Sequence, residues 1–148
     1  ARAYDDSKDI FNSYSKFHKL MGSSGSGQLT KMVNQICIAG LIQALAEGMN
    51  FSEKAGLNTS DVMEVITKGA AQSWQMENRW KTMLADEYDH GFAVDLMRKD
   101  LNIASEEAIK IGADIEITNL VNRFYKDVQD LGGNRLDTSS LLRRLKEK

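Results

Sequence analysis

Apolar residues recur along this chain at spacings of three and four, the repeat of an amphipathic α-helix rather than of a β-strand. The sequence contains no proline, so the strongest interrupter of helices is absent throughout. The longest pattern runs from Gln28 to about Ala55, where Gly56 is a natural left-handed terminator, and would be about 40 Å long as a helix. Between residues 36 and 49 this segment is apolar on nearly every side. We therefore predict an all-α domain wound around one long, buried central helix.

Further helices follow from capping residues and glycine terminators. Asn58 can cap a helix that ends before Gly69, and Ser73 can open another that stops before a loop at residues 89–91. The predicted helices are residues 4–14, 28–55, 59–68, 73–88, 92–111, 115–131 and a short tail helix that starts at Thr138 or Ser139. Residues 16–21 could be a short extended segment. In the longest helix, Gln43, Glu47, Asn50 and Lys54 form the one polar row.

Composition excludes several classes of function. A chain of 148 residues suits one compact domain, and a formal net charge of -2 gives no general attraction to nucleic acid or to a membrane surface. Cys37 is the only cysteine, so no intramolecular disulfide can form, and the two histidines have no partner cluster for a metal site. The apolar run at 36–49 is too short to span a bilayer. These features favour a soluble, cytoplasmic protein without a metal.

Candidate chemistry lies where residues 22–27, with the composition of a flexible linker, lead into the central helix. Lys31 falls near the start of that helix, where burial and the positive end of the helix dipole both disfavour the ammonium form, as acid/base catalysis by a lysine requires. Asn34 and Gln35 lie three and four residues further on, so their amides share its face. The alternative is an ordinary solvated lysine with polar neighbours.

The glycines of this segment match neither common phosphate-binding motif. Gly22, Gly25 and Gly27 are spaced G-x-x-G-x-G, and Lys31 neither follows a glycine directly nor precedes Ser or Thr. We expect no nucleotide-cradling loop here.

Several strings, in order, resemble the C-terminal domain of the beta-hydroxyacid dehydrogenases. They are G-S-G-Q-L-T-K-M-V-N-Q-I, then A-E-G-M-N, A-G-L-N, G-A-A-Q-S-W and G-F-A-V-D-L-M-R-K-D-L. The family includes 3-hydroxyisobutyrate dehydrogenase and tartronate semialdehyde reductase, and is related to 6-phosphogluconate dehydrogenase. The resemblance covers residues 22–148 and implies the helical fold of that family's substrate and dimerisation domain. Residues 1–21 then look like the last helix and strand of an N-terminal Rossmann domain.

The resemblance also implies roles for individual residues. Lys31 matches the family's general acid/base, and Gly27, Asn34, Gln35, Ser73 and Trp74 match segments on the substrate side. Phe92 and Lys99 match the aromatic residue and the lysine that approach the cofactor. The family usually places an asparagine four residues after the lysine, where Gln35 stands here, so either Asn34 or Gln35 takes the amide role. True 6-phosphogluconate dehydrogenases carry His-Asn at those two positions, which argues against that activity.

These roles imply an NAD- or NADP-dependent enzyme that interconverts a short 3-hydroxy acid and its carbonyl form. We expect homo-oligomers paired through the helical domain, and no catalysis by this chain alone. Two of these residues have a simpler alternative interpretation. Lys99 could form a surface ion pair with Asp95, and Trp74 could be a core or interface aromatic residue. The competing class for the whole chain is a non-enzymatic helical dimerisation or interaction module.

Overall fold

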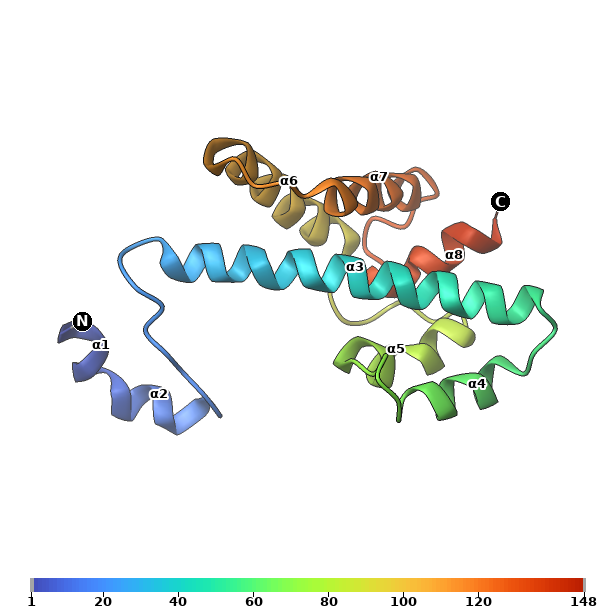
Figure 1. Cartoon of the computed structure of the whole chain (residues 1–148), viewed down its shortest axis with the longest axis horizontal. Coiled ribbons are helices and arrows are strands. Elements are labelled where there is room, and N and C mark those ends of the chain that lie inside the picture. The colour runs from blue at the N-terminus through green and yellow to red at the C-terminus, as the bar shows by residue number, and fades with distance from the viewer. Residues whose placement is uncertain (1, 148) are drawn as a thin grey trace.

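Helices make up the regular structure of residues 2–147, which are the residues that the computed structural model describes (Figure 1). The predicted all-α class is therefore confirmed; Ala1 and Lys148, the outer limits of the two predicted domains, lie outside the described residues. One isolated antiparallel bridge joins Ala93 to Asp137. The helices are α1 (Arg2–Asp6), α2 (Lys8–Tyr14), α3 (Ser26–Lys54), α4 (Thr59–Ile66), α5 (Trp74–Leu84), α6 (Val94–Ile111), α7 (Glu116–Asp130), the 3-10 turn η1 (Thr138–Ser140) and α8 (Leu141–Lys146).

The axis of the fold is α3, which has 29 residues. Helices α6 and α7 pack along one side of it and α4 and α5 along the other (Figure 1), while α8 lies against its C-terminal half, where Lys146 pairs with Glu53. The buried core gathers around α3 and draws on all of these helices: Ala39, Ile42, Leu45, Ala46, Met49, Met63, Met83, Met97, Leu101, Val121, Tyr125, Leu141 and Leu142. The predicted central helix is thus confirmed.

The burial of α3 is one-sided in this single chain. Its exposed apolar residues include Leu29, Val33, Leu41 and Phe51. In the predicted polar row, Gln43 is buried, and its side chain donates to Glu47. Periodicity alone could not separate the two faces, because apolar residues occupy both.

Local signals fix the starts of α4 and α5 and the end of α6 as the sequence predicts, whereas α5 ends at Leu84, well before the loop at residues 89–91. The Asn58 side chain accepts hydrogen bonds from the first turn of α4, and Ser73 Oγ accepts one from Met76 N at 3.0 Å at the start of α5. Gly112 ends α6 with φ 69°, in the left-handed region that favours glycine. The predicted helix at 4–14 is instead divided at Ser7 into α1 and α2, and residues 16–21 form no strand.

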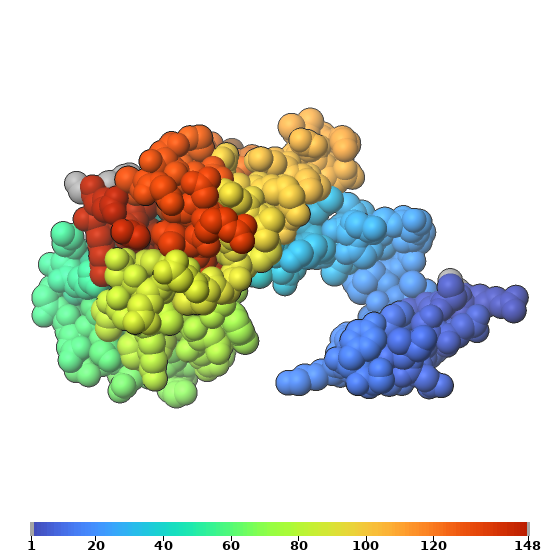
Figure 2. Space-filling model, turned by 180° about the vertical axis from the view of Figure 1, so that it is seen from behind, coloured from blue at the N-terminus to red at the C-terminus, as the bar shows by residue number. Residues whose placement is uncertain are grey.

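The N-terminal segment stands apart from the body of the domain (Figure 2). Neither α1 nor α2 contains a buried residue. The segment holds itself together with an aromatic cluster in which the Tyr4 hydroxyl lies 2.6 Å from His18 Nδ1. Large apolar side chains such as Tyr14 and Phe17 remain exposed.

A backbone strap joins the loop before α6 to the segment before η1. Asp137 N donates to Tyr88 O at 2.8 Å, Thr138 N to Phe92 O at 3.0 Å, and Val94 N to Leu136 O at 2.9 Å. The strap holds residues 88–94 against residues 136–138.

By length and composition, α3 is the one helix within residues 2–147 that meets the criterion for crossing a membrane. The run at 36–49 was expected to be too short, but the helix that contains it continues at both ends. The core helix of a soluble protein can meet the same criterion, and 33% of the apolar window of α3 is buried in this structure.

Candidate functional site

Lys31 is the sixth residue of α3, which begins at Ser26. Its side chain is exposed, and its Nζ lies 5.8 Å from the centroid of the Phe92 ring. This distance is within the range of a cation–π contact. Lys31 lies near the start of the helix as predicted, although Ser26 and Gly27 join the helix rather than the linker. The burial that the sequence led us to expect for Lys31 is also absent, because its side chain is exposed at the surface of α3.

A cavity of about 190 Å³ opens beside Lys31, between α3 and α6. Its lining is Gln28, Lys31, Met32, Gln35, Asp100 and Ile103. An ammonium group, two amides and a carboxylate therefore face one small, otherwise mainly apolar space, which suits a small polar ligand held by a few groups.

A chain of hydrogen bonds runs along the wall of this cavity and links the two helices. Asn34 Nδ2 donates to Gln35 Oε1 at 2.8 Å, and Gln35 Nε2 donates to Asp100 Oδ2 at 2.8 Å. Lys99 Nζ pairs with Asp100 Oδ1 at 3.0 Å. The ion pair of Lys99 with Asp95, the alternative from the sequence, does not form; Asp95 instead accepts from Gln129 and Asn134.

This network distinguishes the two candidate amides. Gln35 is 2% exposed, and both ends of its amide are engaged by protein groups. Asn34 is exposed and keeps its carbonyl oxygen and its second N–H for another partner, counting contacts within the described chain. Gln35 lines the cavity with its amide already paired, whereas the Asn34 amide lies beside it, outside the lining, with hydrogen-bonding capacity left over.

Asp100 was missed as a site residue in the sequence. It lies on the inward face of α6, three residues after Met97 and four before Ala104, both of which are buried. A carboxylate in register with core residues needs a polar partner. The position of Asp100 among core residues of the predicted helix could have identified it as a candidate. The sequence could not have identified Gln35 as its hydrogen-bond partner.

The remaining predicted residues lie elsewhere. Gly27 is exposed in the first turn of α3, four residues before Lys31 and so on its face, with open space where a side chain would point. The Ser73 hydroxyl caps α5 by accepting a hydrogen bond from Met76 N. Trp74 is 59% exposed, and the Arg79 guanidinium lies 5.0 Å from its ring. Neither Ser73 nor Trp74 lines the cavity beside Lys31.

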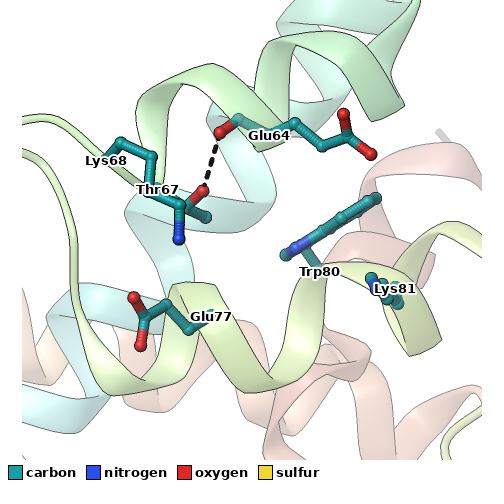
Figure 3. A pocket seen from close by; sticks show the side chains of 6 residues that line it. All are labelled: Glu64, Thr67, Lys68, Glu77, Trp80 and Lys81. Atoms are coloured by element: carbon teal, nitrogen blue, oxygen red, sulfur yellow. Dashed lines mark hydrogen bonds between the residues drawn. The ribbon is translucent and has the colours of Figure 1, made fainter.

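A larger pocket of about 580 Å³ lies between α4 and α5 (Figure 3). Its lining is Glu64, Thr67, Lys68, Glu77, Trp80 and Lys81, so two carboxylates and two ammonium groups share one open groove. None of the predicted site residues lies there. Thr67 Oγ1 donates a hydrogen bond to the carbonyl oxygen of Glu64, and Trp80 is part of the buried hydrophobic core. Size alone therefore does not identify the chemical site.

Comparison with known sequences identifies a family. Residues 25–145 match the family described as NAD-binding of NADP-dependent 3-hydroxyisobutyrate dehydrogenase. The chain is 57% identical over 144 residues to an uncharacterized oxidoreductase of Shewanella frigidimarina, a match that covers 97% of this chain and 50% of the relative. It is 31% identical over 138 residues to the 2-hydroxy-3-oxopropionate reductase of Escherichia coli, covering 93% and 47% of the two chains.

Solved structures show the same fold. A 3-hydroxyisobutyrate dehydrogenase from Salmonella typhimurium superposes with a TM-score of 0.87 at 24% identity, over 95% of this chain and 50% of that one. The 3-hydroxyisobutyrate dehydrogenase of Mycobacterium tuberculosis superposes with a TM-score of 0.86 at 23% identity, over 98% and 52% of the two chains. The chain thus spans about half the length of the relatives it matches.

Proposed function

Because this chain belongs to the family described as NAD-binding of NADP-dependent 3-hydroxyisobutyrate dehydrogenase, we propose that it is the helical half of an NAD(P)-dependent hydroxyacid dehydrogenase. Its substrate would be a short 3-hydroxy acid, which the enzyme interconverts with the carbonyl form. The observation that carries the proposal is the cavity lined by Lys31, Gln35 and Asp100, beside which Asn34 bonds to Gln35 and the Phe92 ring lies against Lys31.

Lys31 is the proton carrier in this proposal. When the hydroxy acid is oxidised, the neutral amine of Lys31 takes the hydroxyl proton while the carbon loses a hydride; in reduction the ammonium returns that proton to the carbonyl oxygen. A bound nicotinamide cofactor would accept or supply the hydride. The position of Lys31 at the rim of the cavity supports this role, since the group must reach the substrate oxygen.

Asn34 and Gln35 divide the amide role. The exposed Asn34 amide contacts the substrate, and Gln35, held by Asp100, fixes its orientation. Phe92 and Lys99 fit the cofactor side, because a half-buried ring can pack against the nicotinamide and a 61% exposed ammonium can reach a phosphate.

The cofactor fold itself would come from another part of the protein. Residues 1–21 are then the end of a preceding nucleotide-binding domain, and residues 22–148 the substrate and dimerisation domain. The exposed Tyr14 and Phe17 support this assignment, because they bury little within this chain and need another surface to cover them. The 148-residue chain alone would then not catalyse.

A second copy of the chain would cover the exposed face of α3. Leu29, Val33, Cys37, Leu41, Ala44, Gly48 and Phe51 follow one another at spacings of three and four and are all exposed, so they form one apolar stripe along the helix. Ala44 and Gly48 permit close approach of another helix. We place the assembled enzyme in the cytoplasm.

The test compares the full-length protein with the 148-residue chain, using NADH and NADPH with short 3-oxo acids. We expect turnover of about 1 s⁻¹ or faster by the former and none by the latter. The competing function, a non-enzymatic interaction module, predicts no turnover by either protein. It also predicts that no strand, G-x-G-x-x-G turn and helix are encoded upstream of this domain.

A further inference from the structure

Asp137 is a buried carboxylate to which the sequence assigned no role. Its residue is 1% exposed, and it lies between α7 and η1, far along the chain from Lys31. Oδ1 accepts from Ser139 N at 3.1 Å and from Ser139 Oγ at 2.6 Å. Oδ2 accepts from Phe92 N at 2.8 Å. Arg79 Nε lies 3.2 Å from Oδ1 as an ion pair without the alignment of a hydrogen bond.

These contacts join three separate parts of the fold at one carboxylate. Arg79 comes from α5, Phe92 from the loop before α6, and Ser139 from η1. Two of these residues also make a cation–π contact with a residue outside the cluster. The Arg79 guanidinium lies 5.0 Å from the Trp74 ring, and the Phe92 ring lies 5.8 Å from Lys31 Nζ. Contacts therefore run from Asp137 to Trp74 through Arg79, and from Asp137 to Lys31 through Phe92.

The loop at residues 88–93 is shaped around this carboxylate. Gly91 has φ +70°, and a Cβ atom built there would lie 2.1 Å from Asp137 Oδ2. The carboxylate thus occupies the space that any side chain at position 91 would need. The backbone strap from Asp137 N to Tyr88 O and from Thr138 N to Phe92 O holds the loop from the other side.

We propose that Asp137 is a positioning residue for the Lys31 site: its carboxylate fixes the 88–93 loop and so holds the Phe92 ring beside the Lys31 ammonium group. The catalytic part of this inference rests on the proposed function; the geometric part does not. Removing the Asp137 carboxylate takes away the hydrogen bond from Phe92 N and so releases the ring from Lys31, while the side chains of both residues stay unchanged.

Asp137→Asn is the sharpest perturbation. If the amide oxygen stays on Ser139 and Arg79, the new NH₂ group faces the Phe92 N–H, so a donor meets a donor and that hydrogen bond is lost. The matched control is Asn58→Ala, which removes the cap of α4 at the opposite end of α3 and destabilises the domain without touching the loop.

The first readout is the NMR resonance of the Lys31 ε protons in the 148-residue chain. The Phe92→Leu variant gives the reference position of the Lys31 resonance when no aromatic ring lies beside the ammonium group. We expect Asp137→Asn to move the resonance most of the way to that position and Asn58→Ala to leave it where it is in the unmodified chain. A Lys31 resonance unmoved by Asp137→Asn would overturn the proposal.

A second measurement needs no variant and applies even if Asp137→Asn fails to fold. In the unmodified chain, the Phe92 amide should exchange with solvent far more slowly than the amide of His90, which makes no hydrogen bond within residues 2–147. Equal exchange rates for the two amides would show that the carboxylate does not hold the loop, and would overturn the proposal.

The third readout is kinetic and uses the full-length protein. Because misplacement of a catalytic group acts on the chemical step, we expect Asp137→Asn to lower kcat about tenfold and to change KM for the hydroxy acid less than about twofold. Asn58→Ala should leave both values near those of the unmodified protein. Equal kcat for the two variants would overturn the catalytic part. If Lys31→Met itself retained turnover, the proposed function would fail while the NMR result would still decide the geometric part.

Discussion

The contact between Gln35 and Asp100 predicts a specific non-additivity in stability. In Asp100→Leu, Gln35 Nε2 loses its carboxylate partner inside a site that is 2% exposed, and only Met97 Sδ, at 3.9 Å, remains as a weak acceptor. An unsatisfied buried donor costs about 1–3 kcal/mol, so we expect a loss of about 2 kcal/mol. In Gln35→Met, Asp100 keeps Lys99 and some solvent, so the loss should be about 1 kcal/mol.

The double variant removes both polar partners at once. Replacing both members of a buried hydrogen bond with apolar groups is nearly neutral, so the double variant should lose less than about 1 kcal/mol rather than the additive value of about 3 kcal/mol. Urea unfolding of the four proteins, followed by circular dichroism, measures each value; with an m-value of about 2 kcal/mol/M, Asp100→Leu shifts the midpoint by about 1 M. Additivity within about 0.5 kcal/mol would refute the coupling inferred from the structure.

Three further outcomes follow from other parts of the molecule. Burial raises the pKa of Tyr88 and of Tyr125 above the ordinary value of 10.0. The stability that each buried, protonated tyrosine gives to the folded state is therefore fully present below pH 10. Above pH 10 the unfolded chain loses the proton first, so the free energy of unfolding should fall by about 1.4 kcal/mol per pH unit for each tyrosine. Urea midpoints from pH 9 to 11 measure this fall, and Tyr88→Phe should halve it; a flat profile contradicts it. Leu41→Glu, on the exposed stripe of α3, should convert a dimer to a monomer in light scattering, whereas an unchanged mass would place the interface elsewhere. Ser73→Ala should cost about 1 kcal/mol of stability by urea unfolding through loss of the α5 cap, and a loss below about 0.3 kcal/mol would show that the cap is not used.

Features encoded in local sequence were predictable. The caps at Asn58 and Ser73 and the terminator at Gly112 each satisfy backbone groups within a few residues, so their roles can be read without knowing the fold. The period of the apolar residues likewise located α3 and the all-α class.

Features that depend on contacts between distant segments were not predictable in this way. The roles of Asp100 and Asp137 arise only when α6 meets α3 and when residues 134–138 meet residues 88–95. The one-sided burial of α3 also escaped periodicity, because both of its faces are apolar and only the packing of α4 to α8 selects the inner one. The choice between Asn34 and Gln35 likewise needed Asp100, which lies 65 residues from Gln35 in the sequence.

Lys31→Met in the full-length protein tests the central claim most directly. The matched control is Lys54→Met, because Lys54 is also exposed on α3 but lies at its far end. With folding and cofactor binding verified, we predict that Lys31→Met lowers kcat by a factor of at least about 100, the contribution of a general acid/base, and that Lys54→Met leaves it unchanged. An unchanged kcat in Lys31→Met would contradict the assignment of proton transfer to this lysine.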